Sequence, residues 1–184
     1  MSVVHAIQPA RWQASVADLG EMERLYLWAV RTWAMGLTRR VEVQADLRGA
    51  FGCHRLEDAI PDFDALMMSL AVGADRSIGI RLRRATVAGR DELILIRALA
   101  AQIRGEGDLV RALLNLLCRG AVLRIALGHL ERLAAAFAAA ALVPEPLTPP
   151  HVPGRGAGDK TGHNRAGHNV VRFCARRGGR TDAA

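Results

Sequence analysis

The chemistry that this sequence offers most plainly is that of arginine. Two basic clusters stand out, one in the middle of the chain and one near its end. They consist of Arg81, Arg83 and Arg84, and of Arg172, Arg176, Arg177 and Arg180. Guanidinium groups bind phosphates and carboxylates through paired hydrogen bonds, so both clusters are candidate sites for an anion or for nucleic acid. Two bland explanations stay open: charge at 81–84 protects an exposed strand edge from aggregation, and charge near the end serves solubility.

Trp28 is the candidate for contact with a protein partner. By helical spacing it lies between Arg24 and Arg31, on the side of its helix away from the main apolar face. Trp and Arg are enriched at the positions that dominate the affinity of protein interfaces. The alternative is a Trp28 buried beneath residues 1–14 or beneath another helix.

Motifs for catalysis or metal binding are missing from the sequence. It contains none of the serine-nucleophile, phosphate-loop, dinucleotide-binding or zinc-protease patterns. Cys53 next to His54 is the one adjacent Cys/His pair, and adjacent residues rarely give the geometry of a nucleophile and its base. The histidines and the cysteine near the end match no zinc-ligand spacing. They are His151, His163, His168 and Cys174. We therefore expect no enzymatic activity, no cofactor and no metal.

Helices are the elements that must position these residues. Hydrophobic residues make up 51% of the chain but aromatic ones only 4%, which predicts an aliphatic core and favours helices over a β-sandwich. The net charge of +7 is concentrated in residues 143–184, which carry seven basic and three acidic side chains. Three cysteines without a CxxC pair indicate a reducing compartment. With no signal-peptide pattern and no apolar run long enough to span a bilayer, the sequence predicts a cytoplasmic protein.

Apolar residues at spacings of three and four predict six helices. These span about residues 16–38, 42–51, 61–72, 91–104, 108–119 and 121–142. Residues 77–84 differ, because Ile78, Ile80 and Leu82 alternate with small or basic residues, a pattern typical of a strand or an extended arm. A strand needs a partner for its backbone groups, and the run 85–87 is a poor one because no turn signal precedes it. Pairing across a dimer and an isolated arm packed on helices both stay open.

The sequence divides into a loose leader at 1–14, a helical domain at 15–142, and a Pro/Gly/Arg-rich tail at 143–184 that is expected to be disordered. We predict an all-α or nearly all-α bundle of about six helices, with one extended arm at 77–84. Its wide apolar helix faces and lack of catalytic motifs favour a non-enzymatic regulatory or adaptor protein, a homodimer that acts through protein–protein contacts. The alternative is a nucleic-acid-binding protein that uses the basic tail and the Arg81–Arg84 cluster. We find no resemblance to a known family.

Overall fold

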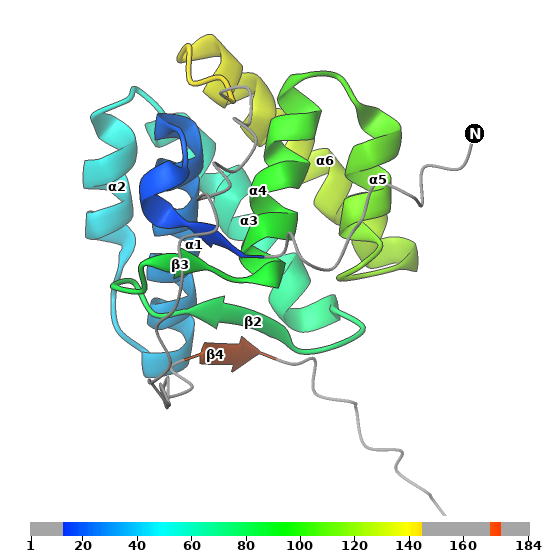
Figure 1. The fold of residues 1–184 in the computed structure, drawn as a ribbon, viewed down its shortest axis with the longest axis horizontal. Helices are drawn as coiled ribbons and strands as arrows, with labels where there is room; N and C mark the ends of the chain where they lie inside the picture. Colours follow the sequence, from blue (N-terminus) through cyan, green and yellow to red (C-terminus); the bar gives the residue numbers. More distant parts are fainter. Residues whose placement is uncertain (1–12, 145–169, 174–184) are drawn as a thin grey trace, which may run out of the picture.

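Figure 1 shows the computed structural model of the chain, which describes residues 13–144 and 170–173. Most of the predicted leader and tail, including Arg176, Arg177 and Arg180, lie outside the described residues. Within the described part, the prediction of a nearly all-α protein with six helices is confirmed. The helices are α1 (Glu21–Arg39), α2 (Gln44–Gly52), α3 (Ile60–Gly73), α4 (Arg90–Ile103), α5 (Gly107–Leu114) and α6 (Gly120–Ala139). No helix of this part is long and apolar enough to cross a membrane.

Helix ends differ from the predicted ones for local reasons. The first helix begins at Glu21, because Val16–Asp18 form a separate 3-10 turn before it. The fifth ends at Leu114, and the carbonyl of Leu117 accepts the amide of Asp75 (3.1 Å) instead of continuing a helical ladder. The sixth ends at Ala139, because Ala141 takes a left-handed conformation with φ of 58° that terminates a helix.

The centre of the core is aromatic, although the composition of the sequence predicts a mainly aliphatic core. Tyr26, Phe51, Phe63 and Phe137 come from α1, α2, α3 and α6, and each is fully buried. Their ring centroids lie 5.6 to 6.2 Å apart in edge-on or tilted pairs, an arrangement that the charge distribution of aromatic rings favours. Leu, Ile, Val, Met and Ala side chains fill the remaining core around them. A few aromatic residues thus join four of the six helices.

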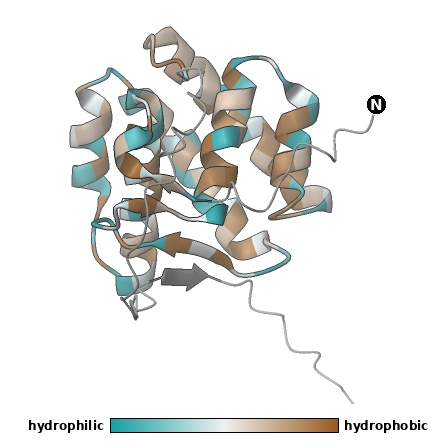
Figure 2. Cartoon of the chain, in the orientation of Figure 1, coloured by the Kyte–Doolittle hydropathy of each residue, from teal (hydrophilic) through white to brown (hydrophobic). Residues whose placement is uncertain are grey.

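Within residues 13–144 and 170–173, four short strands form two antiparallel sheets. The strand β1 (Ala14–Ser15) pairs with β3 (Val87–Ala88), and β2 (Ile78–Arg81) pairs with β4 (Val170–Phe173). The alternation predicted at 77–84 is confirmed at Ile78 and Ile80, which are fully buried, but the strand is shorter than predicted and ends at Arg81. Figure 1 shows both sheets beside the N-terminal end of α4, and Figure 2 shows hydrophobic residues along β2 and α4.

Candidate functional site

The strand β2 has one edge that is held by carboxylates rather than by another strand. Asp91 and Glu92 lie in the first turn of α4, and this N-terminal end of the helix lies beside β2. The amide of Gly79 donates to Oδ2 of Asp91 (2.7 Å), and the amide of Arg81 donates to Oε1 of Glu92 (2.8 Å). These bonds satisfy alternate N–H groups along one side of the strand. An α-helix therefore replaces a neighbouring strand on this edge.

Glu92 is paired with Arg31 of α1 inside the protein. Arg31 Nε donates to Oε1 of Glu92 (2.8 Å) and Nη2 to Oε2 (3.0 Å), while the amide of Gly89 donates to Oε2 (2.8 Å). With the bond from Arg81, each carboxylate oxygen accepts two hydrogen bonds. Such complete satisfaction is what a buried ion pair needs to offset the loss of water around both charges.

The sequence prediction placed Arg31 at the surface beside Trp28, and this is wrong. Arg31 is only 3% exposed. Helical spacing separates polar from apolar residue types, but it cannot tell that a charged side chain has a partner 61 positions away. The other guanidinium contacts are carbonyls: Nη1 donates to Ala85 (2.7 Å) and Nη2 to Val87 (3.0 Å). Arg31 thus fixes both the helix α4 and the loop that follows β2.

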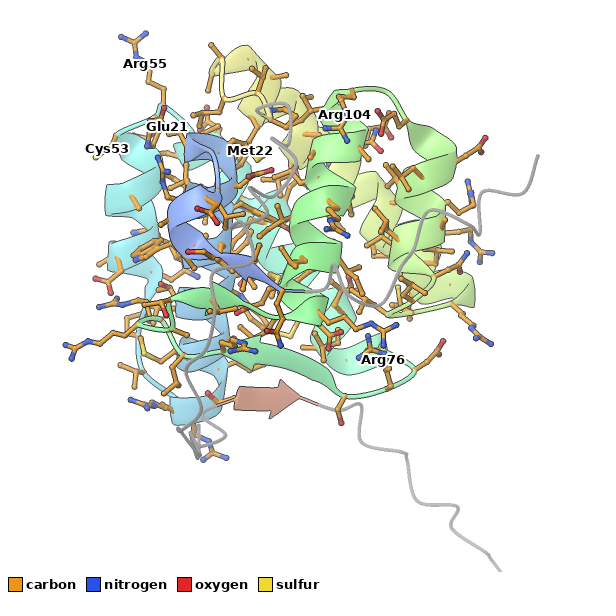
Figure 3. The ribbon with its side chains drawn as sticks, in the orientation of Figure 1. Glu21, Met22, Cys53, Arg55, Arg76 and Arg104 are labelled. Carbon is orange, nitrogen blue, oxygen red and sulfur yellow. The ribbon has the colours of Figure 1, made fainter. Side chains whose placement is uncertain are left out.

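Asp91 forms a second, more exposed ion pair. Arg76, just before β2, binds it through two hydrogen bonds of 2.9 and 2.6 Å, and Figure 3 shows Arg76 at this edge of the molecule. Burial of Asp91 opposes its ionisation, but the hydrogen bonds from Arg76 and from the Gly79 amide outweigh this, so its pKa is lowered. The same pairing raises the pKa of Arg76. Both ends of β2 are therefore anchored to α4 by charge-assisted hydrogen bonds.

The other edge of β2 binds β4, a strand from the region predicted to be tail. The two strands pair antiparallel, with Ile78 opposite Phe173 and Arg81 opposite Val170. Backbone N–H groups alternate along a strand, and those of Gly79 and Arg81 point to α4. Those of Ile78 and Ile80 therefore point to β4, which makes Phe173 and Val171 the hydrogen-bonded positions opposite them. From the sequence we expected this strand to pair across a dimer or to be an isolated arm, and pairing with residues 170–173 was not predicted.

The basic residues of the two predicted clusters are partly brought together. Arg81 is half-buried, and its side chain lies close to Gly89, the residue before α4. If Gly89 carried a Cβ atom, that atom would lie 3.1 Å from Arg81 Nε. Arg83 and Arg84 are exposed in the turn after β2, where Arg83 Nη1 lies 3.5 Å from Oδ2 of Asp46. Arg172 belongs to β4 and lies opposite Gly79, beside this cluster in the sheet.

Trp28 and Arg24 do not form the predicted exposed pair with Arg31. Trp28 is half-buried and packs against the core. Arg24 is exposed, and its Nη1 donates to the carbonyl of Leu19 (2.5 Å). Of the two alternatives for Trp28, an exposed contact residue or a buried one, the structure is closer to the buried one.

A second polar cluster lies between α3 and α6. Oδ1 of Asp62 accepts a hydrogen bond from Arg132 Nε (2.8 Å) and lies 2.9 Å from His129 Nδ1. Burial opposes ionisation of Asp62, yet these two partners together lower its pKa. Within the described residues, no three acidic, histidine or cysteine side chains are grouped to hold a metal ion.

The two cysteines of the described part have opposite environments. Cys53 is exposed and points outward beyond α2 (Figure 3), whereas Cys118 is fully buried. Burial, with the negative charge of Asp75, raises the pKa of Cys118 to about 11, so that it stays a thiol at neutral pH. Neither thiol makes a hydrogen bond to a histidine among the described residues, so neither has a neighbouring base that would activate it.

Comparisons with known proteins add no family to this geometry. No family profile, curated protein or solved structure matches the chain.

Proposed function

We propose that this protein is a non-enzymatic regulatory or adaptor protein that binds an extended polypeptide segment along the edge of β2 that lies opposite α4. One observation carries the proposal: Val170–Phe173 add to that edge as an antiparallel strand, although residues 143–169 separate them from the helical body. Strand addition supplies affinity through main-chain hydrogen bonds and specificity through alternate side chains. We place the protein in the cytoplasm, which the unpaired cysteines Cys53 and Cys118 support.

The acceptor strand is rigidly held, which supports this role. Ile78 and Ile80 are fully buried, and the opposite edge is fixed by Asp91 and Glu92. A strand that is already ordered loses little conformational entropy when a ligand joins it. Since positions 171 and 173 lie opposite Ile80 and Ile78, a ligand needs apolar residues at alternate positions on this face. Protein partners that compete with residues 170–173 for this edge would contain segments with such alternating apolar residues.

The test uses synthetic peptides with the sequence of residues 168–175 and the full-length variant Val171→Pro. Proline at 171 removes an N–H that points to β2, so the variant's own segment should leave the edge open. The unmodified peptide should bind this variant more tightly than the wild type, in which the tethered segment competes at an effective concentration on the order of millimolar. Fluorescence anisotropy of a labelled peptide measures both affinities.

Two N-methylated peptides provide the matched control. Methylation of the amide at 171 blocks a hydrogen bond to β2, whereas methylation at 172 alters an amide that points away from it. We expect the first to abolish binding and the second to retain it. Equal effects of the two modifications, or no binding of the unmodified peptide to Val171→Pro, would refute strand addition.

The second candidate function is nucleic-acid binding, which is favoured by the register of β4, because it puts Arg172 opposite Gly79, two residues along β2 from Arg81. The exposed side chains of Arg83 and Arg84 extend this basic surface. If phosphates bind there, the slope of log affinity against log salt for duplex DNA should fall by about 0.9 for each contacting arginine replaced by glutamine. Arg24→Gln is a control outside the cluster. An unchanged slope after triple replacement of Arg81, Arg83 and Arg84 would exclude this surface.

A further inference from the structure

Three apolar side chains that no described residue covers lie on the neighbouring helices α3 and α6. Ile125 on α6 is 51% exposed, and Met68 and Val72 on the adjacent α3 are 42% and 66% exposed. The helices run antiparallel, because Gly73 at the end of α3 contacts Val122 near the start of α6, whereas Asp62 bonds to Arg132 further along α6. Ile125 and Val72 therefore flank the same stretch of this helix pair. Contiguous exposed apolar groups of this kind mark interaction surfaces.

Gly128 lies one turn beyond Ile125 on the same side of α6. A Cβ on Gly128 would meet nothing nearer than the tip of the Arg132 side chain, at 3.8 Å. A glycine within a helix lowers helix stability relative to alanine, and no neighbour in the described fold requires it here. It does, however, allow another helix backbone to approach closely. The surface of α6 therefore has no side chain at Gly128, near the middle of the helix.

Two opposite charges lie on either side of Gly128. Arg124 and Glu131 are exposed, and neither makes an ion pair or hydrogen bond with another described residue. They are seven positions apart, which puts them on one side of the helix face. If a second α6 crosses antiparallel at Gly128, Arg124 of each copy meets Glu131 of the other, so two ion pairs form by symmetry. Arg132 adds little repulsion, because Asp62 of its own chain already binds it.

We propose that a second copy of this chain docks on this face, with the two α6 helices antiparallel and crossing at Gly128. Charge complementarity selects the occupant, because the face is complementary to itself only in the antiparallel orientation. Ile125 then packs against the aliphatic part of the Arg132 side chain of the second copy. The surface is independent of the strand site proposed above, since none of its residues belongs to β2, β4 or α4.

Charge exchange in the full-length chain tests this orientation. We expect the wild type to be a dimer by sedimentation equilibrium, and Arg124→Glu or Glu131→Arg alone to raise its dissociation constant about tenfold, because each places two like-charged pairs across the axis. The double variant should return to within a few-fold of the wild type. Residues seven apart on one helix are too distant for a direct ion pair, so recovery reports contact between copies. A monomeric wild type, or a double variant no better than the single ones, would overturn the proposal.

Gly128→Leu provides the steric test and Gly49→Leu its matched control. Both glycines lie inside helices with open space beside them, Gly49 on α2 with nothing within 4 Å. Leucine should keep both variants folded, with unchanged helical circular dichroism. Only Gly128→Leu should produce monomers. A dimeric Gly128→Leu variant would contradict the crossing point, and an unaltered peptide affinity in Arg124→Glu keeps this result separate from the strand-addition test.

Discussion

Replacing Arg31 by methionine is the perturbation whose cost the structure specifies best. Methionine fills most of the arginine stem but removes the guanidinium from a site that is 3% exposed. The Glu92 carboxylate then loses two of its four hydrogen bonds and its counter-charge. Removing one partner of a buried ion pair typically costs about 3–5 kcal/mol, because the remaining charge is left uncompensated in a dry environment. The carbonyls of Ala85 and Val87 also lose a donor, but water can reach this part of the loop.

The expected loss is a large share of the whole stability, since domains of this size unfold at a cost of about 5–15 kcal/mol. Arg83→Met is the matched control, because it removes an arginine whose ion pair with Asp46 is long and exposed at 3.5 Å. Such surface pairs contribute at most about 1 kcal/mol. A double variant Arg31→Met/Glu92→Met should not recover fully, since the amides of Gly89 and Arg81 would remain buried without acceptors, at about 1–3 kcal/mol each.

Urea unfolding of the full chain, followed by circular dichroism, measures these differences through the transition midpoint at constant slope. We expect Arg31→Met to unfold at clearly lower urea than Arg83→Met. If the two variants differ by less than about 1 kcal/mol, the buried pair does not carry the stability that its geometry implies. A double variant as stable as the wild type would likewise contradict the expected cost of leaving the Gly89 and Arg81 amides without acceptors.

Three further predictions follow from single sites. Gly73→Ala should destabilise the protein by about 1–3 kcal/mol, because its Cβ would collide with the side chain of Val122; Val122→Ala in the same chain should restore part of the loss, as urea midpoints will show. Tyr26→Phe should raise stability by up to about 1–3 kcal/mol, since the buried Tyr26 hydroxyl has no hydrogen-bond partner among the described residues; a lower melting temperature would contradict this. Asp91 has a lowered pKa, so its contribution is present above its ordinary pKa and is lost as the pH falls through its folded value. The urea midpoints of wild type and Asp91→Asn should therefore differ at pH 7 and converge toward pH 2, whereas a constant gap would refute this assignment.

Local residue patterns were sufficient to predict the features that depend on neighbouring residues. Spacings of three and four located six helices, because one face of each must meet a core. Alternation at Ile78 and Ile80 identified the strand, since successive side chains of a strand point to opposite faces. Pro61 correctly predicted where α3 begins, because proline is common in the first turn of a helix. The prediction of a nearly all-α protein rests on these local rules.

Features that depend on partners far apart in the chain became visible only in the folded arrangement. Periodicity marked Arg31 as polar and hence exposed, but Glu92 meets it inside the core and makes its burial tolerable. Composition assigned residues 170–173 to a tail, yet these four residues pair with β2. They provide hydrogen-bond partners for the backbone groups on the strand edge that faces away from α4. The sequence shows which backbone and side-chain groups must form hydrogen bonds. Which partner each of them binds depends on how the chain folds.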